Sequence, residues 1–111
     1  MAFDPTGFSI STSDRDGRAV VVIRGELDLA TAPELEAAIQ GRLDEGQDVV
    51  VDLRELAFMD STGLRVLVAA HTRVEGTEQR FLIVRPLPGA PIERILAVAG
   101  VEKVLDVVDD V

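Results

Sequence analysis

The segment FMDSTGLRVL, residues 58–67, places a polar turn directly before a run of mainly aliphatic residues. Asp60, Ser61 and Thr62 all belong to the residue types that cap the N-terminus of a helix. Two interpretations follow. Either these side chains only cap a helix, or the Ser61 hydroxyl points into solvent from the helix N-terminus and is the group on which the protein's function depends. Gly63 favours the second, because a residue without a side chain lets another backbone approach closely.

Apolar segments lie on both sides of this turn. Residues 49–53 form a short apolar run that predicts a strand, and residues 81–84 predict another. Between them, residues 64–74 predict a helix with apolar residues on more than one side, so we expect that helix to be mostly buried. The Ser61 loop would then follow a central strand, where open α/β sheets usually place their active groups.

The N-terminal part of the chain predicts a hairpin followed by a helix. Residues 8–13 alternate between apolar and small polar residues, residues 14–17 are typical of a turn, and residues 19–23 are continuous and β-branched. Residues 25–28 are expected to break this second strand. Residues 31–34 (TAPE) match a capping box, which predicts an amphipathic helix that ends near residues 45–47.

The C-terminal part predicts an irregular loop at residues 86–89 and then a helix that Gly100 ends. Residues 104–108 predict a short edge strand or a frayed end. The complete order is β-β-α-β-α-β-α with a possible final strand. We therefore expect one α/β domain over residues 1–111, with a mixed, mostly parallel sheet of four or five strands and three or four helices. Residues 1–7 and 109–111 are expected to be frayed.

Composition excludes several classes of function. The chain has 111 residues, which suits one domain, and 47% apolar residues, enough for a core. It has no cysteine and one histidine, which argues against a metal centre. A net charge of −9 argues against binding to nucleic acid or to an anionic membrane. We find neither a signal peptide nor a membrane span, and we expect a cytoplasmic protein.

Three short strings resemble the STAS domain and, more narrowly, the bacterial anti-sigma factor antagonists. They are GELD at residues 25–28, VVDL at residues 50–53 and FMDSTGL at residues 58–64. The resemblance extends over about residues 8–108. It implies the STAS fold.

The resemblance also implies a function. In this family, the unmodified protein binds an anti-sigma factor, a serine kinase with a histidine-kinase-like ATP fold, and thereby frees a sigma factor. That kinase phosphorylates the serine that matches Ser61, and a serine phosphatase removes the phosphate. Asp28 matches an acidic position near this serine. We expect the partner surface to consist of Asp28, Asp60, Ser61, Thr62 and Gly63, together with exposed positions at the start of the following helix such as Arg65, and we expect no cofactor and no metal.

Several alternatives stay open for single residues and for the function. Asp28 could be turn chemistry alone, and Thr62 could be a cap or a second phosphate acceptor. A serine hydrolase is disfavoured because the G-x-S-x-G motif is absent and His71 lies ten residues along the helix, about 15 Å from Ser61. The glycine-rich motifs of nucleotide-binding folds are also absent. The main alternative is a STAS subunit of a lipid-transport or stress-signalling complex that binds proteins without being turned over by a kinase.

Overall fold

A computed structural model describes residues 7–111, and within this range the chain forms an α/β fold of six strands and four helices. One sheet has the strand order β1-β2-β3-β5-β6, and β4 pairs with β2 outside this path. Only the β1–β2 pair is antiparallel, so the predicted mixed, mostly parallel sheet is confirmed. The elements are β1 (Ser9–Arg15), β2 (Arg18–Leu27), α1 (Ala32–Asp44), β3 (Asp48–Asp52), β4 (Leu56–Met59), α2 (Ser61–Val74), β5 (Phe81–Val84), α3 (Pro91–Ala99), α4 (Val101–Val104) and β6 (Asp106–Val108).

The predicted hairpin closes through a two-residue loop. Asp16 and Gly17 have φ angles of 54° and 83°, both in the left-handed region. Asp-Gly is a preferred pair for this turn, because its backbone twist matches the twist of the strands that it joins. The strands then pair in register from Arg15 opposite Arg18 to Ser9 opposite Arg24.

Strand β2 does not break at residues 25–28 as predicted; it continues to Leu27. Its register shifts between Gly25 and Glu26, where Gly25 has a φ of 91°. From this bulge at Gly25 onward β2 pairs with β4, a strand that was not predicted from the sequence, and Leu27 lies opposite Met59. Strand β2 therefore has β3 as a neighbour over residues 18–22 and β4 over residues 25–27.

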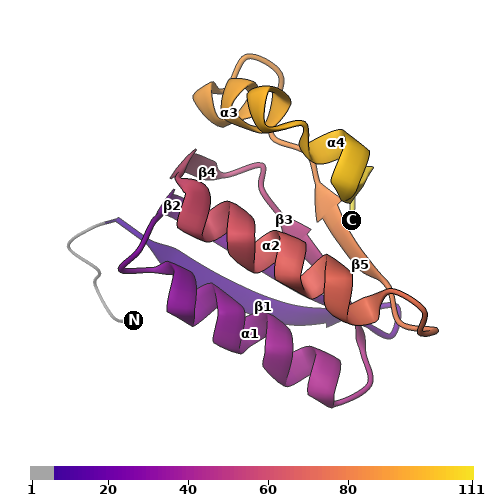
Figure 1. The fold of residues 1–111 in the computed structure, drawn as a ribbon. Coiled ribbons are helices and arrows are strands. Elements are labelled where there is room, and N and C mark those ends of the chain that lie inside the picture. The colour runs from indigo at the N-terminus through magenta and orange to yellow at the C-terminus, as the bar shows by residue number, and fades with distance from the viewer. Residues whose placement is uncertain (1–6) are drawn as a thin grey trace.

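The helices share one apolar core on the same side of the sheet. Figure 1 shows α1 and α2 side by side, with α3 and α4 further along the sheet. Each helix contributes to the main core cluster, for example through Leu35, Leu67, Ile92 and Val101. A smaller cluster of Val50, Leu82 and Val84 lies apart from it, with Val108 and Val111 packed against it.

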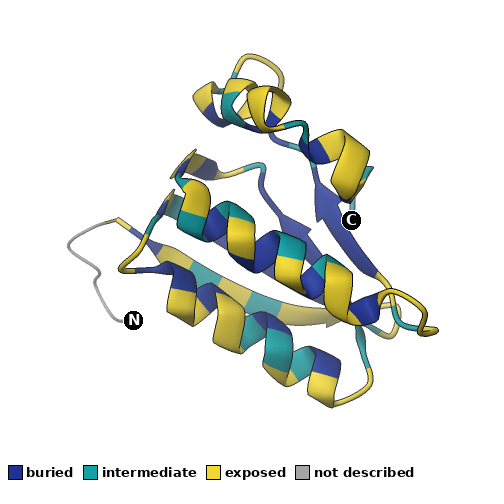
Figure 2. Ribbon diagram, viewed as in Figure 1, coloured by how far each residue is buried: buried dark blue, intermediate teal, exposed yellow. Residues whose placement is uncertain are grey.

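Helix α2 is buried on one face and exposed on the other, which corrects the prediction that it is mostly buried. Val66, Leu67 and Ala70 are buried, whereas Arg65 and Ala69 are exposed. Figure 2 shows this as a dark face turned to the sheet and a yellow face turned to solvent. The aliphatic residues alone suggested burial on all sides, but alanine is small enough to be tolerated on the solvent face.

The C-terminal region follows the prediction in part. Helix α3 ends at Gly100, whose φ of 69° suits a glycine C-cap. The edge strand is present as β6, but residue 104 lies in the short helix α4, which was not predicted. Of the termini expected to be frayed, residues 1–6 lie outside the described part. Asp109 and Asp110 form ion pairs with Arg85 and Arg54, respectively.

The buried acid of the VVDL string has a structural partner. Asp52 is 5% exposed and accepts hydrogen bonds from the backbone N–H and the guanidinium of Arg54, the closest at 2.8 Å. Burial raises the pKa of Asp52, but the bonds and charge of Arg54 outweigh it, so this pKa lies below its ordinary value. Asp52 is therefore paired within the fold.

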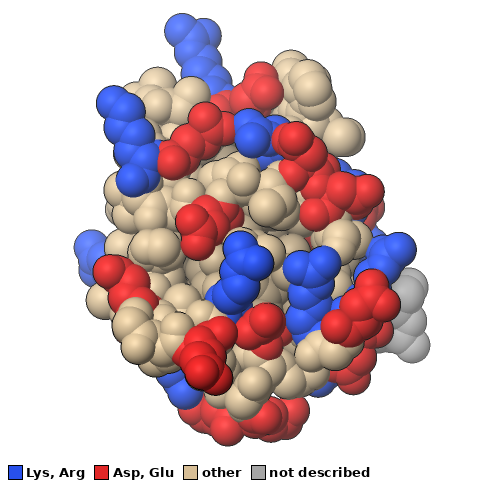
Figure 3. Space-filling model, turned by 90° about the vertical axis from the view of Figure 1, so that its right-hand side faces the viewer, with Lys and Arg blue, Asp and Glu red and all other residues tan. Residues whose placement is uncertain are grey.

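Charge is spread over the surface. On the face shown in Figure 3, basic and acidic side chains alternate and no continuous basic area is visible. Among residues 7–111, no helix combines the length and apolar character required to cross a membrane.

Two glycine substitutions test the bulge. Gly25→Ala should lower the free energy of unfolding by about 1–3 kcal/mol, because its Cβ would meet the Gly7 carbonyl oxygen and its φ is positive. Gly41→Ala, in the exposed interior of α1, should raise that free energy by about 0.5–1 kcal/mol, since a Cβ there meets nothing. Urea unfolding measures both. Equal changes of the same sign would show that the bulge is unimportant.

Candidate functional site

Asp60, and not Ser61, caps helix α2. Asp60 has an extended backbone, and its Oδ1 accepts the N–H groups of Thr62 at 2.9 Å and Gly63 at 3.4 Å. The Thr62 hydroxyl donates to the same oxygen. The Ser61 side chain is exposed and makes no hydrogen bond to any residue between 7 and 111. The two interpretations of this turn therefore apply to different residues: Asp60 and Thr62 build the cap, and the Ser61 hydroxyl stays free.

The cap keeps a negative charge next to Ser61. The pKa of Asp60 lies below its ordinary value, chiefly because the Thr62 hydroxyl donates to the carboxylate and also because the N–H groups of Thr62 and Gly63 do so. Hydrogen bonds to the charged form of an acid favour that form. Asp60 is therefore ionised at neutral pH, and any group attached to Ser61 lies beside an anion.

Pairing between β2 and β4 brings Asp28 to the same place. Leu27 and Met59 are paired residues, and the next N–H, that of Asp60, donates to the Leu27 carbonyl at 3.1 Å. Neighbouring strands lie about 4.8 Å apart. Asp28 and Asp60, which are far apart in the sequence, thus leave the sheet side by side. The structure thus brings together two of the predicted site residues, Asp28 after β2 and Asp60 after β4.

Asp28 also shapes its own turn. Its Oδ1 accepts the N–H groups of Ala30 at 3.0 Å and Thr31 at 3.2 Å, the pattern of an Asx turn. The capping box predicted at residues 31–34 is wrong. The Thr31 hydroxyl donates to the Glu26 carbonyl and accepts the Asp28 N–H, both at 2.9 Å. Asp28 Oδ2 makes no hydrogen bond within the described range, so turn chemistry does not occupy the whole carboxylate.

Gly63 lets the first turn of α2 pack closely on the strand ends. A Cβ at this position would lie 2.7 Å from side-chain carbons of Leu27 and of Met59. The close approach expected at this glycine is real, but its partners are side chains and not another backbone. A larger residue would displace the helix start, and Ser61 with it.

A groove runs beside Ser61 between the first turns of α1 and α2. It has a volume of about 320 Å³, and Leu29, which is 75% exposed, stands at its edge. Of the predicted residues, Thr62 and Arg65 line it. The sequence analysis missed the other lining residues. The signal that could have found Leu29 is a large apolar residue in a loop just before a helix. The complete lining is Leu29, Ala32, Pro33, Glu36, Thr62, Arg65, Val66 and Ala69.

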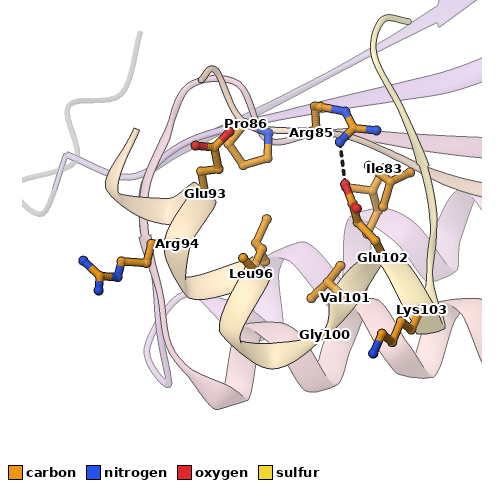
Figure 4. A pocket seen from close by; sticks show the side chains of 12 residues that line it. Ile83, Arg85, Pro86, Glu93, Arg94, Leu96, Gly100, Val101, Glu102 and Lys103 are labelled. Carbon is orange, nitrogen blue, oxygen red and sulfur yellow. Dashed lines mark hydrogen bonds and ion pairs between the residues drawn. The ribbon is translucent and has the colours of Figure 1, made fainter. Parts of the chain in front are cut away.

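The larger cavity lies elsewhere, beneath α3 and α4. Its volume is about 600 Å³, and no residue of α1 or α2 lines it. Figure 4 shows Leu96 and Val101 turned into this space and the ion pair of Arg85 with Glu102 at its edge. It is thus separate from the groove beside Ser61.

The single histidine of the sequence is not positioned to activate Ser61. His71 lies on α2, ten residues further on, and its Nε2 is 3.9 Å from Glu75. The Oδ1 atom of Asp60 accepts hydrogen bonds from Thr62 and Gly63. Residues 7–111 also contain no group of three His, Cys, Asp or Glu side chains arranged to hold a metal ion. The geometry offers a free hydroxyl on Ser61 next to the ionised Asp60, near a partly apolar groove that Thr62 lines.

Comparisons with known proteins agree with this fold. The family model described as "Mlab, STAS domain" matches residues 10–108. The chain is 33% identical over 100 residues to the anti-sigma-F factor antagonist RsfB of Mycobacterium tuberculosis, covering 89% of this chain and 80% of that protein. It is also 33% identical over 76 residues to an anti-sigma-B factor antagonist of Staphylococcus aureus, covering 68% of this chain and 70% of that one.

A solved structure extends the agreement to the whole fold. The crystal structure of an anti-sigma factor antagonist from Mycobacterium paratuberculosis superimposes with a TM-score of 0.83 at 30% identity, covering 97% of this chain and 91% of that one. The family match spans most of the chain and includes the Ser61 loop and the groove. This chain belongs to the STAS domain family and, within it, to the anti-sigma factor antagonists.

Proposed function

We propose that this protein binds an anti-sigma factor when Ser61 is unmodified, and that phosphorylation of Ser61 ends this binding. The observation that carries the proposal is the exposed, unbonded Ser61 hydroxyl, which Asp60 leaves free by capping the helix itself. The family membership and the names of the relatives supply the class of partner.

The proposed partner is both target and modifying enzyme. By the family pattern, the anti-sigma factor is a serine kinase with a histidine-kinase-like ATP fold, and it transfers the phosphoryl group from its own ATP to Ser61. A serine phosphatase resets the protein, and both reactions take place in the cytoplasm. Under this scheme the chain needs no cofactor of its own.

The fold tolerates a phosphate at this position. A phosphoserine carries about −1.5 to −2 charges near neutral pH. Ser61 is the first residue of α2, where the positive end of the helix dipole favours an anion. The phosphorylated chain should therefore keep its structure.

The complex does not tolerate the phosphate. An interface that packs around a small hydroxyl would have to bury a dianion beside the ionised Asp60 and beside Asp28. An unpaired buried charge costs several kcal/mol, and each 1.4 kcal/mol is a tenfold loss of affinity. We therefore expect affinity to fall by a factor of about 100 or more without a change of fold.

The groove between α1 and α2 supplies the apolar part of the proposed interface. Leu29, which is 75% exposed, lines this groove, and Phe58, which is 41% exposed, lies in β4 three residues before Ser61. Apolar side chains at the centre of an interface commonly carry most of its binding energy. Polar contacts would come from Asp28, Thr62 and Arg65 around them.

The first prediction concerns the modification. Incubation with the cognate anti-sigma factor and ATP should add one phosphate to the wild-type chain, at Ser61. Ser61→Ala should accept none and should bind the anti-sigma factor about as tightly as the unmodified chain. Ser61→Asp should bind at least about tenfold more weakly, since it adds a charge beside Asp60. Mass spectrometry locates the phosphate, and calorimetry gives the affinities.

Two outcomes would contradict this proposal. A phosphate found on Thr62 alone would show that the modified hydroxyl is that of Thr62 and not that of Ser61. Binding without any phosphate transfer, equal for the alanine and aspartate variants, would favour the alternative, a STAS subunit of a lipid-transport or stress-signalling complex that no kinase turns over.

A second prediction concerns the groove. Leu29→Asn should weaken binding to the anti-sigma factor about tenfold or more, because a leucine that becomes buried contributes about 1.5–3 kcal/mol. Leu87→Asn is the matched control, since Leu87 is also an exposed loop leucine, at 54%, and lies between β5 and α3, outside the groove. Equal affinities for the two variants would remove the groove from the interface.

A further inference from the structure

Arg65 is an arginine without a counter-ion in a strongly acidic chain. The sequence has 20 acidic and 11 basic residues, and Arg24, Arg42, Arg54, Arg73 and Arg85 all form ion pairs. Arg65 is exposed on α2 and forms neither an ion pair nor a side-chain hydrogen bond with any residue from 7 to 111. Its guanidinium is therefore available for another anion.

The position of Arg65 relative to Ser61 suits a phosphate. The two residues are four apart on the same helix, so their side chains lie one above the other, with Cβ atoms about 5–6 Å apart. A helical pair is also more stable when the anion precedes the cation in sequence, which is the order here. The planar guanidinium can bind two phosphate oxygens at once.

The carboxylates around Arg65 leave it available. One carboxylate oxygen of Asp60 already accepts hydrogen bonds from the N–H groups of Thr62 and Gly63. Glu36 lines the same groove from α1, yet it forms no ion pair with Arg65 in the structure. A phosphate on Ser61 would carry about twice the charge of either acid. It should therefore attract Arg65 more strongly than they do.

We propose that Arg65 is the intramolecular counter-ion of phosphorylated Ser61. When the phosphate is added, the guanidinium leaves the rim of the groove and pairs with it. This inference rests on the proposed function of Ser61 and adds a second element to the switch. Phosphorylation then changes the partner surface twice, because the surface gains an anion and loses the free cation of Arg65.

The phosphate itself reports this pairing. Phosphoserine incorporated at position 61 during translation requires no kinase, and ³¹P NMR follows its second ionisation with pH. A nearby cation favours the dianion and lowers this pKa. We expect the phosphate pKa to be lower in the wild-type chain than in Arg65→Gln by at least about 0.3 pH units, with Arg65→Lys between them.

Arg94→Gln is the matched control. Arg94 is an exposed arginine of α3 that forms no ion pair or side-chain hydrogen bond within residues 7–111, so its loss changes the net charge by the same amount at another place. It should leave the phosphate pKa unchanged within about 0.1 pH units. An unchanged pKa in Arg65→Gln, or an equal shift in Arg94→Gln, would overturn the proposal.

Binding measurements with the same proteins separate this inference from the proposed function. If the phosphate pKa depends on Arg65 but phosphoserine does not weaken binding to the anti-sigma factor, the proposed counter-ion is supported and the proposed switch is wrong. If phosphoserine weakens binding but the phosphate pKa is the same in the wild-type chain and in Arg65→Gln, the proposed switch is supported and the proposed counter-ion is wrong.

Discussion

The pairing of the end of β2 with β4 is the contact on which the site depends. From Gly25 onward the end of β2 pairs with β4, and the Asp60 N–H donates to the Leu27 carbonyl at 3.1 Å. This arrangement places the Asp28 turn and the start of α2 next to each other. Gly63 completes it, because its lack of a side chain lets α2 rest on Leu27 and Met59. Without this contact, the acids and the hydroxyl would be unrelated loop residues.

The division of roles within the turn explains how one residue can be modified without loss of the fold. Asp60 and Thr62 form the cap and hold each other through hydrogen bonds. Ser61 contributes its backbone to the helix, while its hydroxyl is not used in the structure. A phosphate on that oxygen therefore breaks no hydrogen bond among residues 7–111. Its effect is on what can approach from outside, which is the property expected of a local electrostatic switch.

Much of the fold could be predicted because its signals are local. The Asp-Gly turn, the apolar strands and the Gly100 cap are each encoded by neighbouring residues, and a helix start near Ser61 or Thr62 follows from the capping residue types at positions 60–62. The errors arose where the outcome depends on distant contacts. Strand β4 is only four residues long, and two of them are exposed, so its pairing with β2 leaves no periodic pattern. The capping box is an exception with a local cause: Thr31 matches the box by type, yet its hydroxyl bonds to Glu26 and Asp28, five and three residues before it.

The same distinction applies to the site. The motif and the family resemblance predicted roles for Ser61 and Asp28, and Arg65 was predicted as an exposed residue at the start of the helix. The structure places Asp28 and Ser61 just after two paired strand ends and Arg65 in the lining of the groove. No sequence pattern showed that Asp60, and not Ser61, would accept the N–H groups of the first turn, nor that Leu29 would stand at the edge of a groove. The groove depends on how α1 and α2 lie against each other.

The central claim is that phosphate on Ser61 changes the surface and leaves the fold intact. Comparing ¹H–¹⁵N spectra of the chain with serine and with phosphoserine at position 61 tests it most directly. The account predicts shifts limited to the Asp28 turn, the Ser61 loop, the first turns of α2 and the groove. Large shifts throughout the buried strands β3 and β5 would contradict it, because they would show that the switch acts by rearranging the core.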